Sequence, residues 1–183
     1  MMKRPANWDE VEASTGEFKR LTAGGHACVI LNAEVTRSKS GKEMLVLDFD
    51  IDEGDEFAGY FSEQYGRYSE NGNAAKWPND GTYRQLTEGK SMGFFKGMLQ
   101  NIEASNEGWK WNWNEKELVG KKFGGVFREE AYINNKGDKR TRVTCIAVRP
   151  VQGIENVTVP TPKDTTGSQP SGGFGSVADE IPF

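Results

Sequence analysis

The chain has 183 residues, a length that suits one domain with a hydrophobic core. Two cysteines and one histidine are too few for a zinc site, and no stretch resembles a membrane span or a signal peptide. The formal net charge of −4 argues mildly against nucleic-acid binding, but residues 110–149 carry ten Lys and Arg against five acidic residues, so one basic region lies within an acidic chain.

The first predicted elements are two strands joined by a polar turn. Residues 1–23 have no clear periodicity, but from Gly25 apolar residues alternate with their neighbours through Val35, which predicts a strand. This strand ends at the glycine-containing turn 37–42, and a second strand follows to form a hairpin. One face of the second strand is predicted to carry Leu45, Leu47, Phe49 and Ile51.

The middle of the chain is predicted to contain a short strand, a long loop and a helix. The third strand is expected near residues 58–65, and the polar segment 66–90 is expected to be a loop, which in a compact domain is either functional or disordered. Ser91 is a candidate N-cap for the helix that follows. The apolar stripe of this helix is Met92, Phe95, Met98, Leu99 and Ile102.

Two more strands, 126–133 and 140–148, are predicted on either side of the polar hairpin loop 134–139. The resulting order is three strands, a helix and two strands. This is the order of the five-stranded OB-fold barrel, in which the helix lies between the third and fourth strands and closes one end. The sequence therefore predicts a mainly β fold of this class.

The domain boundary is expected where the composition changes. Residues 1–153 are predicted to form the OB-fold domain, and 154–183 a flexible tail, because the Gly/Ser-rich stretch 167–176 cannot build a core. Cys28 and Cys145 lie in apolar strand-like runs, which predicts small buried side chains and fits a reducing cytoplasm.

The candidate functional residues are basic and aromatic side chains on three segments: the first hairpin loop, the region from the third strand into the long loop, and the last hairpin. Binding of single-stranded DNA without sequence preference needs a positive groove for phosphates and exposed aromatic rings on which bases stack. In an OB barrel, the first and last hairpin loops flank the binding face. The predicted DNA-binding residues are Arg37, Lys39, Lys42, Tyr60, Tyr65, Arg67, Trp77, Arg128, Tyr132, Lys136, Lys139, Arg140 and Arg142.

Three tryptophans, Trp109, Trp111 and Trp113, occur at alternate positions and would share one face of an extended segment. They can form a stacking platform for bases or pack over the barrel end and the helix. Packing is favoured for two of the three, because large aromatic side chains carry much of the buried area of a core.

Three acidic residues, Asp48, Asp50 and Asp52, alternate along the second strand and share a face. A solvated strand face is the favoured interpretation, and the alternative is a metal cluster of a small nuclease. An acidic face in the groove would repel phosphate, so DNA is expected to follow other strands or the loops. With one histidine, His26, acid–base catalysis is not expected, and the chain is predicted not to be an enzyme.

The end of the chain carries a short acidic cluster followed by Ile-Pro-Phe, after a stretch rich in glycine and serine. This segment resembles the C-terminal tip of bacterial-type single-stranded DNA-binding proteins, and that resemblance implies docking on proteins of replication, recombination and repair. The chemistry suits this role, because the last residue offers a ring and a carboxylate to one pocket with a basic side chain. The predicted partner-binding residues are Asp179, Glu180, Ile181, Pro182 and Phe183.

The resemblance and the predicted fold together indicate a protein that coats and protects single-stranded DNA, with no cofactor and no metal. The divergence of the core suggests, by resemblance, a phage- or plasmid-type member that acts in the cytoplasm of a bacterial host. Two alternatives are a recombination mediator or protein-interaction module, and a small metal-dependent nuclease. Whether the chain forms a homo-oligomer is left open by the sequence.

Overall fold

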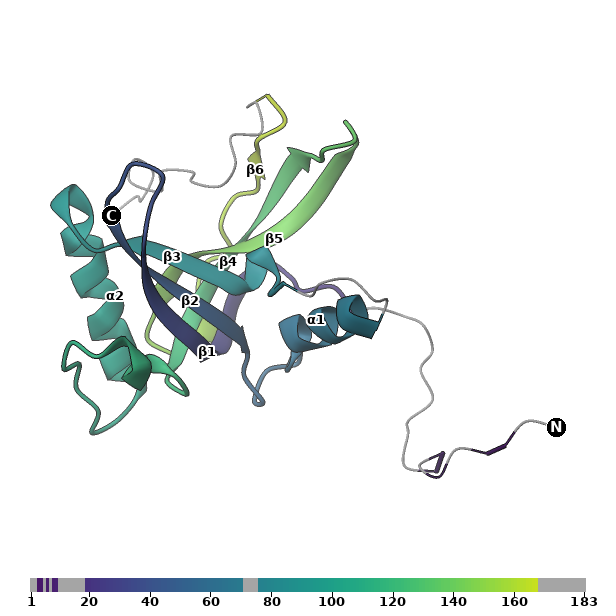
Figure 1. Cartoon of the computed structure of the whole chain (residues 1–183), viewed down its shortest axis with the longest axis horizontal. Coiled ribbons are helices and arrows are strands. Elements are labelled where there is room, and N and C mark those ends of the chain that lie inside the picture. The colour runs from purple at the N-terminus through teal and green to yellow at the C-terminus, as the bar shows by residue number, and fades with distance from the viewer. Residues whose placement is uncertain (1–2, 5, 7, 10–18, 71–75, 168–183) are drawn as a thin grey trace.

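The computed structural model describes residues 3–4, 6, 8–9, 19–70 and 76–167, and Figure 1 shows a mainly β architecture with helices on two sides of a sheet. No helix in these ranges is long and apolar enough to cross a membrane. The hydrogen-bonded strand order is β3-β2-β1-β4-β5, with β6 added beside β4, and every pair is antiparallel except β4–β6. The strands are β1 (Gly24–Arg37), β2 (Glu43–Ile51), β3 (Thr82–Leu86), β4 (Lys122–Ile133), β5 (Lys139–Arg149) and β6 (Lys163–Asp164).

The first hairpin, β1–β2, is confirmed, and it contains a bulge that strict alternation does not predict. Cys28 and Ile30 face the core, but the register with β2 shifts between Ile30 and Asn32. The extra residue, Leu31, is 42% exposed, and the next buried position on the strand is Ala33. A bulge of this kind bends a strand and raises its twist, which lets β1 pair with β2 along one part and with β4 along another.

The predicted third strand is wrong: the segment near residues 58–65 contains the start of helix α1 (Tyr60–Glu70) instead. Its aromatic residues favour a strand by composition, yet Phe57, Phe61 and Tyr65 are spaced by four, which is the helical period. A carboxylate from β2 stabilises the first turn, because Asp50 accepts hydrogen bonds from the backbone N–H groups at positions 61 and 62 at 2.9 and 3.0 Å.

The true third strand, β3, lies inside the segment for which the sequence predicts a loop. It follows the short 3₁₀ turn η1 (Asn79–Gly81) and pairs with β2 from Met44↔Leu86 to Asp48↔Thr82. Only five residues long, β3 is too short for its alternation to stand out from the polar residues around it.

The predicted helix is confirmed as α2 (Met92–Ser105), between β3 and β4. Its apolar stripe packs on the sheet, whereas Met92 at its start is 59% exposed. The buried residues of the stripe are Phe95, Met98, Leu99 and Ile102.

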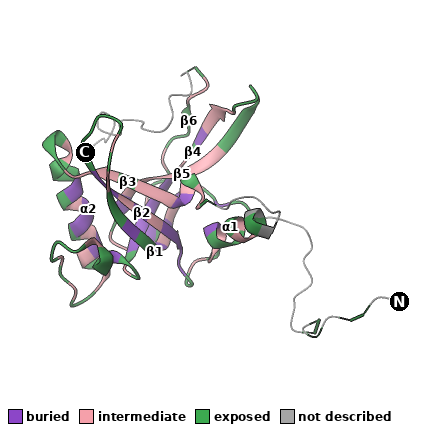
Figure 2. Ribbon diagram, viewed as in Figure 1, coloured by how far each residue is buried: buried purple, intermediate pink, exposed green. Residues whose placement is uncertain are grey.

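The core lies between the sheet and α2, and Figure 2 shows buried residues following β1, β2 and the inner side of α2. Phe49 is at its centre, with edge-to-face ring contacts of 5.4–6.1 Å to Phe61, Phe123 and Phe127. Cys28 is fully buried, as predicted, and burial raises the pKa of its thiol. Cys145 is half-buried against the core, and burial raises its pKa to about 12.

The chain after residue 153, for which the sequence predicts a tail, continues along the sheet as far as it is described. The 3₁₀ turn η4 (Ile154–Asn156) packs on β1 and β4, and Ile154 is 6% exposed. This packing requires glycine: a Cβ on Gly25 would lie 1.8 Å from the backbone oxygen of Ile154, and one on Gly124 would lie 2.7 Å from its side chain. Beyond η4, β6 pairs with β4 at Glu130↔Lys163 and Ala131↔Asp164.

Candidate nucleic-acid interface

The β1–β2 loop is a tight turn held by its own backbone. Ser38 N donates to the carbonyl of Lys42 at 2.8 Å, and Gly41 N donates to the carbonyl of Ser38 at 2.9 Å. Gly41 has φ +79°, a left-handed conformation that favours glycine. Arg37 Nη1 donates to the Gly41 carbonyl at 2.9 Å, whereas Lys42 is exposed and forms no ion pair within the described chain. Lys39 is also exposed on this loop.

The β4–β5 loop is organised by one side chain. Asn134 Oδ1 accepts from the backbone N–H groups of Lys136 and Asp138, both at 2.9 Å, and Gly137 has φ +84°. Lys136 at the tip is exposed and has no ion-pair partner among the described residues. Figure 1 draws this hairpin projecting away from the sheet, with β6 alongside it.

One face of the β4–β5 hairpin carries a cluster of charges that are already paired. The register places Glu130 opposite Arg142, and Glu130 is only 8% exposed. Its carboxylate accepts from Arg128 Nη2 at 2.8 Å and from Arg142 Nη2 at 3.3 Å. The guanidinium of Arg142 also lies 5.1 Å from the ring centre of Tyr132. We call Arg128, Glu130 and Arg142 the hairpin cluster.

A second carboxyl group, that of Asp80 in η1, lies next to the hairpin cluster, with its Oδ1 3.9 Å from Arg142 Nε. Burial raises the pKa of Asp80, although the neighbouring Arg142 acts in the opposite direction. Two arginines therefore meet two carboxyl groups. As a result, most of the positive charge on this face of the hairpin is paired with carboxylates of the protein itself.

Two further cations of the hairpin, Lys139 and Arg140, form exposed ion pairs. Lys139 Nζ lies 3.3 Å from Asp164 of β6, and Arg140 Nη2 lies 3.6 Å from Asp138. Hydrogen bonds from Thr166 and from Lys139 lower the pKa of Asp164 to about 2. Exposed pairs of this kind contribute little to stability, so the two cations can exchange partners at small cost. We call Lys42, Lys136, Lys139 and Arg140 the loop cations.

The predicted segment that runs from the third strand into the long loop begins on a helix instead of a strand. Tyr60, Tyr65 and Arg67 belong to α1, where Arg67 forms an ion pair with Glu63. Tyr60 packs against the core, whereas Tyr65 is 38% exposed, and its ring centre lies 5.7 Å from that of Trp77.

Trp77 is held in place by the turn that precedes β3. Its Nε1 donates to the Gly81 carbonyl at 2.9 Å, and a Cβ on Gly81 would lie 2.8 Å from both this indole nitrogen and the ring of Phe61. This packing fixes Trp77 and leaves Tyr65 as the more accessible ring of the pair.

Asp48, Asp50 and Asp52 are half-buried or buried and contact structural partners, which corrects the prediction of a solvated face. Asp50 is 4% exposed and caps α1, and Asp52 is 9% exposed and forms an ion pair with Lys122 at 2.8 Å. The hydrogen bond from Lys122 to Asp52 raises the pKa of the lysine. Asp48 accepts from Thr82 Oγ1 at 2.9 Å. In the described ranges, no group of three or more His, Cys, Asp or Glu could hold a metal.

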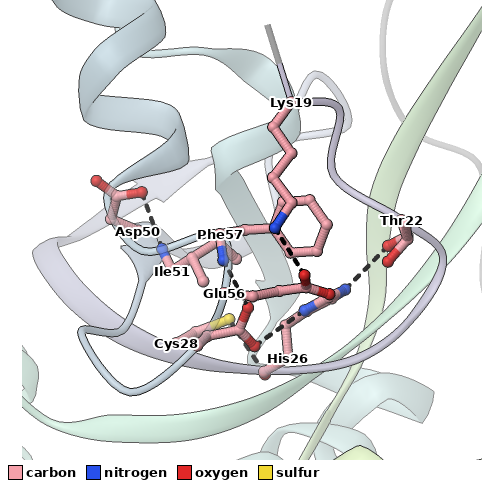
Figure 3. A network of polar contacts seen from close by, with 9 residues as sticks. Lys19, Thr22, His26, Cys28, Asp50, Ile51, Glu56 and Phe57 are labelled. Carbon is pink, nitrogen blue, oxygen red and sulfur yellow. Dashed lines mark hydrogen bonds and ion pairs between the residues drawn. The ribbon is translucent and has the colours of Figure 1, made fainter.

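His26 serves to attach the segment before β1, as Figure 3 shows. It is 6% exposed, with Nδ1 3.0 Å from Asp55 Oδ2 and Nε2 3.0 Å from the carbonyl oxygen of Thr22. Nearby, Lys19 Nζ donates to Glu56 at 2.7 Å. Both ring nitrogens are therefore occupied by acceptors of the protein itself.

Two of the three tryptophans pack against the core, as predicted. Trp109 and Trp111 pack against the core, whereas Trp113 is 79% exposed. Their rings form a chain with centre-to-centre distances of 6.3 and 6.1 Å.

The residue that sequence reasoning missed is Glu130. A signal for it existed: Arg128, Glu130 and Tyr132 alternate on β4, and the hairpin loop places them opposite Arg140 and Arg142. That register alone puts a carboxylate among the arginines.

The segment for which the sequence predicts partner binding, residues 179–183, lies outside the described residues. Comparison of the chain with protein-family models and with curated proteins gives no match.

Proposed function

We propose that this protein binds single-stranded DNA without sequence preference and protects it. The observation that carries the proposal is the strand order β3-β2-β1-β4-β5 with a helix between β3 and β4, which is the order of an OB-fold. The approach of Asp80, next to β3, to Arg142 of β5 supports closure of the sheet into a barrel. In such a barrel the β1–β2 and β4–β5 loops flank the ligand. Lys42 and Lys136 lie in these two loops, and Lys139 and Arg140 begin β5 next to the second loop.

The proposed DNA contacts are made by the cations that are not held by a buried carboxylate. Lys42 and Lys136 meet phosphates directly, and Lys139 and Arg140 exchange their exposed carboxylate partners for phosphates. Tyr132 offers a ring whose orientation the guanidinium of Arg142 supports, and a base can stack on it. The protein needs no cofactor and performs no chemistry. It acts in the cytoplasm of a bacterial host cell, as the phage-type resemblance implies.

A titration of fluorescently labelled oligo-dT, followed by anisotropy, tests this function. We expect saturable binding that weakens with salt, with a slope of about −0.7 in log K against log salt for each phosphate contact. An unlabelled duplex of the same length should compete poorly. Binding that does not respond to salt, or equal competition by duplex, would contradict the proposal.

Removal of residues 179–183 tests the proposed tail. We expect the shortened protein to bind oligo-dT as well as the full chain or slightly better, because an acidic tip competes with phosphate for basic surface. Pull-down of bacterial replication and repair proteins should be lost, and Phe183→Ala should cause most of that loss because few residues dominate a small interface. A tail of unchanged length that ends in Gly-Ser-Gly-Ser-Gly is the control for length. Capture of the same proteins by this control would show that the tip is not the docking element.

A further inference from the structure

A cavity of about 240 Å³ opens between the start of β2, the β3–α2 connection, α2 and the tryptophan segment. It combines an aromatic lining with carboxylates, and none of the loop cations lines it. We call it the aromatic–acidic pocket. Its chemistry is carried by Phe95, Trp111, Trp113, Glu43, Glu88 and Glu115.

The aromatic side of the pocket includes an exposed tryptophan with an unusual backbone conformation. Trp113 is 79% exposed and has φ +69°, the only positive φ of a non-glycine residue within the described chain. A bulky residue in this conformation is strained, and such strain gathers at ligand sites. Trp111 lies beside it with ring centres 6.1 Å apart, and its buried Nε1 has no acceptor among the described residues. The pair therefore has exposed ring surface and an unused donor.

The acidic side of the pocket consists of carboxylates without a salt bridge to any described residue. Glu88 Oε1 accepts from the backbone N–H of Glu43 at 3.0 Å, and Glu43 Oε1 accepts from Thr87 Oγ1 at 2.9 Å. These donors are neutral, and in the described part of the chain neither these two carboxylates nor that of Glu115 takes part in an ion pair. Three carboxylates outside any salt bridge of the described chain, around aromatic rings, favour a cation over a phosphate.

We propose that the aromatic–acidic pocket binds one lysine or arginine side chain from a basic segment of a partner protein. The aliphatic stem would lie against Phe95 and Trp111, and the cationic head would reach the carboxylates and the face of Trp113. The volume fits this occupant, because pockets that hold whole small-molecule ligands begin at about 300 Å³. None of its lining residues belongs to the segment 179–183 proposed for docking, so the pocket adds a second contact point for a protein partner.

The indole ¹⁵N–¹H signals of the full-length protein provide the test, with N-acetylated, C-amidated Gly-Gly-Lys-Gly-Gly as probe. We expect the signals of Trp111 and Trp113 to shift saturably with this peptide and with its arginine counterpart. The same peptide with Nε-acetyl-lysine keeps the stem and loses the charge, so it should bind about tenfold more weakly or not at all. Trp113→Gly removes the ring and relieves the positive φ, so it should fold normally and abolish the response.

Two further variants separate the pocket from general charge effects. Glu43→Gln combined with Glu88→Gln and Glu115→Gln should weaken peptide binding about tenfold or more, and Glu129→Gln, an exposed carboxylate on β4, should leave it unchanged. Oligo-dT binding by the pocket variants should equal that of the wild type, so this proposal can fail while DNA binding stands. Equal binding of the acetylated peptide, absence of any indole shift, or a shift of Trp113 by oligo-dT would overturn the proposal. A shift that depends on protein concentration alone would instead assign the pocket to a second copy of the chain and would also overturn it.

Discussion

Replacement of the four loop cations with alanine is expected to lower the affinity for oligo-dT between about 100- and 1,000-fold at about 0.1 M salt. Each phosphate bound on a single strand adds about 0.7 to the salt exponent, so at this salt concentration each cation removed should weaken binding about fivefold. The slope of log K against log salt should become shallower by about three. Stability should change by less than about 0.5 kcal/mol per site, because all four side chains are exposed.

The control for this variant removes the same charge from another surface. Four exposed lysines lie on or near α2 and the tryptophan segment, and their replacement by alanine changes the net charge equally. These residues are Lys90, Lys96, Lys110 and Lys116. If this control loses as much affinity as the loop variant, net charge and not the two hairpin loops drives binding, and the proposed interface is wrong.

Glu130→Gln is expected to lower the free energy of unfolding by about 2–3 kcal/mol. The substitution leaves Arg128 and Arg142 beside a neutral amide, and removal of one partner from a fully buried ion pair costs about 3–5 kcal/mol. The expected loss is smaller here because the side chain of Arg142 is 35% exposed and therefore screened by water. Urea titration followed by circular dichroism measures the change.

Glu129→Gln is the matched control, since Glu129 is the neighbouring exposed acid and faces the other side of β4. We expect it to change stability by no more than about 0.5 kcal/mol. The two arginines should differ in the same way, because Arg142 is paired with Glu130 and Arg140 is exposed. Arg142→Ala should lower the stability of the protein, whereas Arg140→Ala should weaken the binding of oligo-dT. Equal stability of the Glu130 and Glu129 variants would mean that the hairpin cluster does not hold the hairpin in place.

The sequence by itself predicted the elements whose burial follows a regular local period. Alternation in β2 and the i, i+3, i+4 stripe of α2 reflect one face packed against a core, and both elements formed as expected. The hairpin loops were equally visible, because Gly41 and Gly137 occupy left-handed positions that few other residues adopt.

Only the tertiary structure decided what depends on a partner distant in sequence. The helix after Phe57 is capped by Asp50, which reaches its first turn from β2, and this contact cannot be read from the local sequence. The partners of charged residues were also decided by the fold. The sequence predicts Arg142 as a DNA-binding cation, but in the structure it is paired with Glu130 and Asp80. Local periodicity reports that a side chain is buried or exposed. Local periodicity does not say which charged partner a side chain contacts, because that pairing is set by register and packing between elements.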